Sequence, residues 1–203
     1  MTRDEIISQG VEAALKLAET SKWGALTLGE IAEEAGLTLK DFHGLADKDD
    51  LSEAIEVIFD AAMSDEPIDS DETARTRLFD VIMLRFEAME DVRDGVMSYL
   101  RWRDRSFDGL ALRLKSRAAT AKWALTCAGL DGSSQIPRGV QIASLGWAIA
   151  QAERAWRQET SADLSRTMAA LDAELIKIEE RVAWVKSRGK RKSSSEPEPA
   201  ADQ

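Results

Sequence analysis

The chain has 203 residues, a formal net charge of −10 and a hydrophobic content of 44%. This length suits one domain, or a small head on a larger body, and it permits a stable core without metals or disulfides. The single cysteine, Cys127, excludes an intrachain disulfide and favours a reducing compartment. The acidic balance argues against a general nucleic-acid coat, since non-specific DNA affinity comes from neutralising phosphates, but it leaves a local site open.

Composition predicts an all-α protein. Ala, Leu, Glu and Arg dominate, β-branched runs are nearly absent, and only four prolines occur. The N-terminal stretch MTRDEIISQG has neither a basic region nor an apolar core, so we expect no secretion signal. No apolar run approaches the roughly 18 residues of a membrane span. We therefore expect a cytoplasmic protein with no membrane span.

The N-terminal part predicts four helices, over about 3–20, 28–35, 39–43 and 48–63. Thr27, followed three residues later by Glu30, forms a capping box that starts the second helix. Gly36 permits a sharp corner after it, and Thr38 starts the short third helix. The acidic stretch SDEPIDSDE at 64–72 ends the fourth helix.

The rest of the chain predicts five more helices, over about 73–90, 91–104, 107–129, 135–158 and 161–185. We assign 1–47 to a head and 48–185 to a body. The remainder, 186–203, mixes Ser, Pro and charge with few apolar residues, and is predicted to be a disordered charged tail.

The stretch LTLGEIAEEAGLTLKDFHGLADKDDL, residues 26–51, places two short helices around a tight corner. This pattern is typical of a helix-turn-helix, although such corners also occur as plain packing units. With one helix before the pair, KDDL opening a fourth helix and an all-α body, the chain resembles the TetR family. The resemblance implies a TetR-like fold, in which a three-helix head containing the helix-turn-helix sits on an α-helical ligand-binding and dimerisation body.

The resemblance also implies a set of residues that face double-stranded DNA, with the last on phosphate: Thr27, Thr38, Leu39, Lys40, His43 and Lys48. The family's second aromatic is missing here, where Leu45 and Ala46 stand. Acidic residues outnumber basic ones in the head, and Asp41 lies within the presumed reading helix. Support of the corner by His43, and simple solvation of the two lysines, remain alternatives.

Large side chains spread over the body helices are usually core residues. In the TetR family the body encloses a cavity for an apolar ligand. The resemblance therefore implies that a small apolar ligand is lined by Met97, Trp102, Phe107, Trp123 and Trp147.

The final helix carries apolar residues at alternating four- and three-residue steps from Leu164 to Val182, which is a heptad seam. The helix before it offers small residues that permit close approach. We predict a two-fold homodimer, with packing of the seam within its own chain as the alternative. The predicted interface comprises Ala143, Trp147, Ala150, Leu164, Met168, Leu171, Leu175 and Ile178.

A second resemblance concerns AWRQETSADLSRTMAALDAELIKIEE, which is similar to the C-terminal region of the lipid-binding accessory protein of ubiquinone biosynthesis. That family shares the TetR-like fold without binding DNA. An enzyme is not predicted, because the chain has one His and one Cys and lacks CxxC, HxxxH and a Gly-rich phosphate loop. The acids and arginines of WRDRSFD are explained by charge pairing. We expect no metal and no cofactor.

The prediction is a dimeric, ligand-responsive DNA-binding transcriptional regulator of the TetR type. An apolar ligand between body helices would move the fourth helix and change the spacing of the two reading helices, so that DNA is released. The alternative is a lipid- or isoprenoid-binding protein whose acidic head does not contact DNA. An adaptor acting only through protein contacts is a third possibility.

Overall fold

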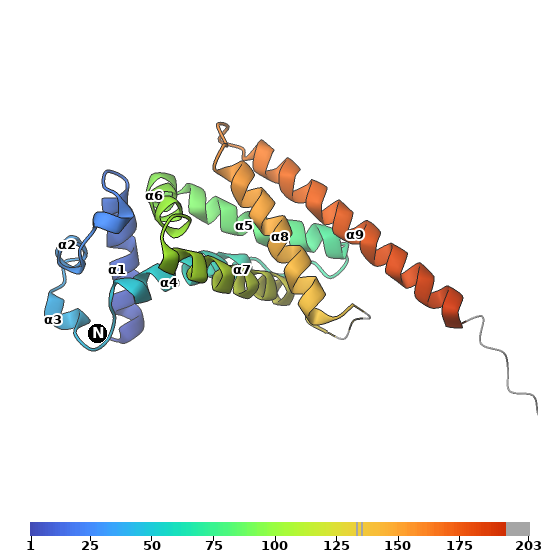
Figure 1. Ribbon diagram of the computed structural model, residues 1–203, viewed down its shortest axis with the longest axis horizontal. Coiled ribbons are helices and arrows are strands. Elements are labelled where there is room, and N and C mark those ends of the chain that lie inside the picture. Colours follow the sequence, from blue (N-terminus) through green and yellow to red (C-terminus); the bar gives the residue numbers. More distant parts are fainter. Residues whose placement is uncertain (133, 135, 194–203) are drawn as a thin grey trace, which may run out of the picture.

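The computed structural model describes residues 1–132, 134 and 136–193, and this part of the chain is helical without strands. A three-helix head, formed by α1 to α3, lies at one end, and α4 leads from it into the body (Figure 1). In chain order the α-helices are α1 (Arg3–Ala18), α2 (Leu28–Glu34), α3 (Leu39–Phe42), α4 (Lys48–Ala61), α5 (Ala74–Glu90), α6 (Arg93–Arg103), α7 (Phe107–Cys127), α8 (Arg138–Trp156) and α9 (Ser165–Ser193). Two short 3₁₀ turns are η1 (Trp23–Ala25) and η2 (Ala62–Ser64). The expected all-α fold is confirmed.

Side-chain caps set the helix starts in the head. The predicted capping box of α2 is present, because Thr27 accepts from the Glu30 backbone N–H while the Glu30 carboxylate accepts from the Thr27 N–H. Asp47 accepts from the N–H groups of the residues two and three positions on, so it begins α4. Gly36 follows α2 with φ of 68°, a left-handed conformation that glycine adopts without strain.

The last helix is longer than predicted. Helix α9 ends at Ser193, whereas the sequence pattern placed the helix end at 185 and a disordered tail from 186 onward. The apolar seam ends at Val182, but Lys and Arg are good helix formers and are favoured by the dipole at a helix C-terminus. Figure 1 shows the C-terminal half of α9 projecting beyond the other helices. The rest of the predicted tail, 194–203, lies outside the described residues.

The head has its own apolar centre beneath α1. Ile31, Phe42 and Leu51, from α2, α3 and α4, are at most 1% exposed. A Cβ on Gly10 would lie 2.9 Å from the Leu51 side chain and 3.2 Å from the Phe42 ring. Because α1 has no side chain at this point, the short helices of the head pack directly against its backbone.

The head is fixed to the body by a close crossing of α1 and α6. A Cβ on Gly95 of α6 would lie 2.2 Å from the backbone oxygen of Leu15 on α1. This distance is well below any real carbon–oxygen contact, and the obstacle is backbone, which cannot rotate away. Glycine is therefore required for the two helices to pack as closely as they do.

No helix in the described ranges is both long enough and apolar enough to pass through a bilayer.

Replacing Gly95 by alanine should separate α1 from α6 and lower the free energy of unfolding by roughly 1–3 kcal/mol or more. Urea denaturation followed by circular dichroism measures the change. Gly139, in the first turn of α8, is the matched control, because a Cβ there meets nothing within 4 Å. Gly139→Ala should be neutral or stabilise the fold by up to about 1 kcal/mol. Equal stability of the two variants would contradict the close crossing.

Candidate functional site

Helix α3 presents a small polar surface at the end of the molecule furthest from α9 (Figure 1). Four of the six predicted DNA-facing residues lie on it or at its ends and are exposed to solvent: Thr38, Leu39, Lys40 and His43. A fifth, Thr27, is exposed at the start of α2. Phe42 points the opposite way and is 1% exposed, so it holds the helix against the head core. The surface is therefore open and rigidly supported.

Two acidic residues that the sequence places near this surface form hydrogen bonds at the starts of helices. The Asp41 carboxylate accepts from the Thr38 backbone N–H at 2.8 Å and from its hydroxyl at 2.7 Å. Glu30 accepts from the N–H and hydroxyl of Thr27, each at 2.7 Å. These hydrogen bonds lower the pKa of both carboxyl groups, so both remain charged. The two threonine hydroxyls consequently donate to their own chain.

Further acids of the head are paired with bases away from α3. Glu34 contacts Lys16 at 2.5 Å, and Asp50 contacts Arg3 at 2.8 Å. Both pairs are exposed and contribute little to stability. Within the ranges that the structure describes, neither Lys40 nor His43 forms a salt bridge with a carboxylate. The α3 surface therefore keeps a free ammonium group and an imidazole despite the acidic head.

Lys48 lies apart from that surface. Its ammonium group donates to the backbone oxygens of Trp23, at 2.8 Å, and Leu26, at 2.5 Å. Partial burial lowers its pKa. Two of its three N–H donors thus hold the η1 turn against the start of α4, and one remains for a phosphate. The predicted phosphate contact stays a prediction.

An aromatic cluster joins the η1 turn to the body. Trp23 is fully buried, and its ring lies edge-on to Tyr99 with centroids 5.3 Å apart. Trp102 packs beside both rings, at 6.4 Å and 6.0 Å. The Trp23 backbone N–H also donates to the Ser98 hydroxyl at 3.0 Å. Helix α6 therefore packs against the loop that precedes the helix-turn-helix and holds it in place.

A buried ion network fixes α4 to the body. The Glu56 carboxylate of α4 is 5% exposed and accepts from Arg85 at 2.6 Å, Arg103 at 2.5 Å and the Tyr99 hydroxyl at 3.1 Å. Although burial opposes ionisation, the two arginines hold the pKa of Glu56 below its usual range. One turn later, Asp60 accepts from the Thr120 hydroxyl. Burial raises the pKa of Asp60.

The network continues to α8. Arg103, 1% exposed, also donates to both oxygens of Glu153 at 2.7 and 2.9 Å. Arg157 donates to Glu153 and to Asp104, each at 2.6 Å. The surrounding arginines lower the pKa of Glu153 to about 2, against the effect of burial. The sequence analysis predicted charge pairing within WRDRSFD, but it missed Glu56 and Glu153, whose only signal was a charge among apolar helical positions.

The five predicted ligand-lining residues lie in different places. Met97 is half-buried against the core, and Trp102 belongs to the aromatic cluster at the head. The Trp123 indole N–H donates to the Asp60 backbone oxygen at 2.8 Å. Phe107 is 87% exposed and Trp147 is 59% exposed. The structure does not bring these side chains together as one wall, so an apolar ligand stays a prediction without an assembled site.

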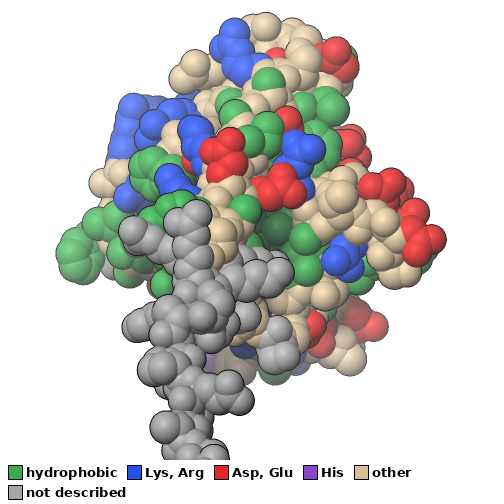
Figure 2. Space-filling view, turned by 90° about the vertical axis from the view of Figure 1, so that its right-hand side faces the viewer, with side chains coloured by type: hydrophobic (Ala, Val, Ile, Leu, Met, Phe, Trp, Pro, Cys, Tyr) green, Lys and Arg blue, Asp and Glu red, His purple; other side chains and the backbone are tan. Residues whose placement is uncertain are grey.

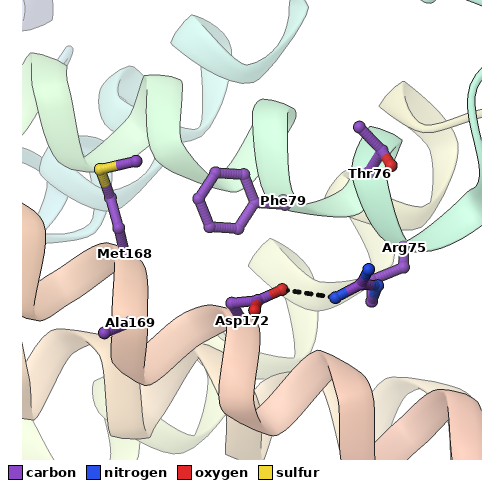
Figure 3. Close-up of a pocket in the computed structure, with 6 residues that line it drawn as sticks. All are labelled: Arg75, Thr76, Phe79, Met168, Ala169 and Asp172. Carbon is purple, nitrogen blue, oxygen red and sulfur yellow. Dashed lines mark hydrogen bonds and ion pairs between the residues drawn. The ribbon is translucent and has the colours of Figure 1, made fainter.

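A pocket of about 340 Å³ lies between α5 and α9. Figure 3 shows Arg75 reaching from α5 to Asp172 on α9, with the Phe79 ring directed toward Met168. The Arg75–Asp172 ion pair measures 2.8 Å. One side of the pocket is therefore apolar and the other carries a paired charge. None of these residues was among those predicted to bind a ligand.

Three of the predicted interface residues are internal to the chain. Leu164, Leu171 and Leu175 are 4%, 0% and 2% exposed, so they belong to the protomer core and are unavailable to a partner. Ile178 is half-buried against the same core. At these positions the apolar side of α9 packs on α5 and α8 of its own chain, which is the alternative that the sequence analysis gave for the seam.

Other apolar side chains of α8 and α9 remain exposed. We refer to them together as the outer α8–α9 face: Val140, Ala143, Trp147, Met168, Ala169, Ala173 and Ile176. Two of them, Met168 and Ala169, also line the pocket between α5 and α9. The predicted residues Ala143, Trp147 and Met168 belong to it, and Ala150 is half-buried beside them. Figure 2 shows hydrophobic side chains exposed among basic and acidic ones at the end of the molecule toward which α9 projects. Exposed apolar surfaces of this kind are typical of association surfaces.

Metal chemistry has no support in the described residues, where no group of three or more His, Cys, Asp or Glu side chains is arranged to hold an ion.

Comparison with solved structures shows the fold. A TetR transcriptional regulator from Nitrosomonas europaea is similar, with a TM-score of 0.68 at 19% identity, over 88% of this chain and 98% of that one. A TetR transcriptional regulator from a Rhodococcus species is also similar, with a TM-score of 0.59 at 15% identity, over 84% and 95% of the two chains. No family model matches the sequence, and no curated protein matches it. The chain thus has the TetR-like fold expected from the sequence.

The low pKa of Glu153 predicts a specific acid sensitivity. A carboxyl group whose folded-state pKa is depressed contributes stability above its unfolded pKa, and that contribution is lost as the pH falls through the folded value. The wild type should therefore lose roughly 3 kcal/mol between about pH 4.5 and pH 2 through this group. Glu153→Gln should be less stable at pH 7 and should lack this component in urea titrations at several pH values. Parallel pH profiles for the two proteins would show that Glu153 is not held ionised.

Proposed function

We propose that this protein is a dimeric DNA-binding transcriptional regulator of the TetR type. The observation that carries the proposal is the exposed α3 surface, where, among the described residues, Lys40 and His43 form no salt bridge. The nearby acids Asp41 and Glu30 are held by Thr38 and Thr27, and two acids further from α3 are paired with Lys16 and Arg3. The fold shared with two TetR regulators supports the same function. A cytoplasmic location is part of the proposal.

In this proposal α3 enters the major groove of DNA. Lys40 contacts a phosphate or a base edge, His43 contributes a ring nitrogen, and Thr38 and Leu39 lie close to the bases. The overall acidity of the chain weakens non-specific binding, since each phosphate contact must overcome long-range repulsion. Two heads on one operator offset the weakness of a single head.

Dimerisation is proposed to bury the outer α8–α9 face against its copy in a second chain. Trp147 is the largest exposed side chain on that face, and small alanines around it permit close approach of the helices. A two-fold axis through this face pairs the same surface on both chains. The two α3 helices are then held at a spacing set by the bodies.

Ligand response is proposed to act through α4. This helix joins the head to the body, and Glu56 ties it to α5 and α6. A ligand that rearranges the body changes the position of α4 and with it the spacing of the two α3 helices, so DNA affinity falls. Release by a small apolar ligand, as the sequence analysis expects, belongs to this proposal.

A lipid- or isoprenoid-binding protein without DNA affinity is the competing function. The observation that favours it is the acidity of the head, whose carboxylates are paired locally but not removed. The two functions differ in one measurement, which is salt-dependent binding to DNA.

Lys40→Ala should weaken binding to duplex DNA and flatten its salt dependence. A plot of log affinity against log salt should lose a slope of about two for the dimer, one for each subunit, because each lysine releases about one counterion. Fluorescence anisotropy on random-sequence duplex at several salt concentrations measures this.

Lys122→Ala is the matched control for that experiment, since it removes the same charge from an exposed site on α7. It should leave the slope unchanged. A wild-type protein that shows no DNA binding even at low salt would contradict the proposed regulator function and favour the lipid-binding alternative.

Trp147→Glu should convert the dimer to a monomer, because it places two charges opposite each other at the centre of the interface. Sedimentation velocity across a concentration series measures the mass. Leu114→Glu is the control, since Leu114 is 66% exposed on α7, away from the outer α8–α9 face. A wild type that sediments as a monomer at all concentrations, or equal dissociation of both variants, would argue against this interface.

A further inference from the structure

The outer end of the buried ion network contains more guanidinium groups than its carboxylates can satisfy. We call these side chains the arginine cluster, and they are Arg103, Arg113, Arg117 and Arg157, from α6, α7 and the end of α8. Two carboxylates, Asp104 and Glu153, lie among them. Arg103 alone has another acidic partner, Glu56, which it shares with Arg85.

The distances show which arginines form close ion pairs with a carboxylate. Arg157 makes close contacts to both carboxylates at 2.6 Å, and Arg103 contacts Glu153 at 2.7 Å. Arg113 then reaches Asp104 only at 3.4 Å, and Arg117 reaches Glu153 only at 3.5 Å. These two contacts are long for charge-assisted hydrogen bonds, which usually measure about 2.7–2.9 Å.

The cluster also holds buried donors without acceptors. In the described part of the chain, the Nε atom of every member is buried and has no hydrogen-bond partner. A buried donor left unsatisfied costs about 1–3 kcal/mol, and more when it is charged. Including Arg85, Glu56 and Asp60, the network formed by the described side chains has five arginines and four carboxylates, which leaves one formal positive charge among them. The region therefore lacks acceptors as well as negative charge.

The cluster is open to solvent on one side. The side chains of Arg113 and Arg117 are each 29% exposed and that of Arg157 is 23% exposed, whereas Arg103 at 1% closes the inner side. Arg113 and Arg117 are four residues apart on α7, so they lie on one face of that helix. A small molecule can reach them without entering the apolar core.

We propose that the arginine cluster binds a small oxyanion, the carboxylate or phosphate group of a small molecule, between α7 and the end of α8. Planar guanidinium groups present paired N–H donors that match the oxygens of such groups, which makes arginine the preferred residue for them. The bound group accepts from the terminal N–H groups of Arg113 and Arg117, whose contacts with carboxylates are long, and neutralises the excess charge. The site differs in chemistry from the apolar ligand expected from the sequence, and its occupation requires neither DNA nor a second chain.

Isothermal titration calorimetry on the full chain tests the proposal with inorganic phosphate and, separately, with acetate. Ionic strength is held constant with sodium chloride. We expect saturable binding of at least one of them at one site per chain. Saturation by phosphate alone identifies a phosphoryl group as the natural ligand group, and saturation by acetate alone identifies a carboxylate.

Arg117→Gln should weaken this binding at least about tenfold, since it removes a charged hydrogen-bond donor. Arg101→Gln, on the exposed side of α6, removes the same charge and should bind like the wild type. Circular dichroism verifies that each variant is folded, and Arg113→Gln serves in place of Arg117→Gln if the latter is not.

Three results would overturn the proposal. These are no saturable heat with either anion, equal loss of affinity in Arg101→Gln, and binding of chloride with the affinity of the oxyanions.

Discussion

The ion pairs of one nearly buried guanidinium, that of Arg103, hold the body of this protein together. It donates to Glu56 on α4 and to Glu153 on α8. Helix α6 is thereby joined to two helices that are distant from it in the sequence. Removing either carboxylate would leave an uncompensated charge in the interior, which costs far more than the pair itself contributes. The relative positions of these three helices are therefore set by charge geometry as well as by apolar contact. Tyr99, which donates to Glu56 and packs on Trp23, extends the same constraint to the head.

The head shows why net charge is a poor guide to a local surface. Its acidic side chains are not spread evenly over the face that α3 presents. Asp41 and Glu30 complete the first turns of their helices, where the backbone N–H groups and the helix dipole favour negative charge. Among the residues that the structure describes, neither Lys40 nor His43 forms a salt bridge. Long-range repulsion of DNA remains, while the Asp41 and Glu30 carboxylates are held at the starts of their own helices.

The interior of the body is more polar than the resemblance to the TetR family implies. The large aromatics that the sequence offers for a ligand wall are distributed between the head, the surface and the network, with Trp102, Trp147 and Trp123 as examples. The space between α4, α6, α7 and α8 is occupied by paired charges instead.

The sequence by itself determined the all-α class, the helix start at Thr27, the corner at Gly36 and the apolar seam of the last helix. These features depend on neighbours a few residues apart, through capping, glycine conformation and helical periodicity. Tertiary structure alone decided that the apolar seam of α9 packs inside its own chain at Leu164, Leu171 and Leu175, because an apolar helix face can be buried by its own body or by a second chain. It also decided that Glu56 and Glu153 meet across 97 residues of chain at one arginine, since pairing between distant charges leaves no local pattern in the sequence.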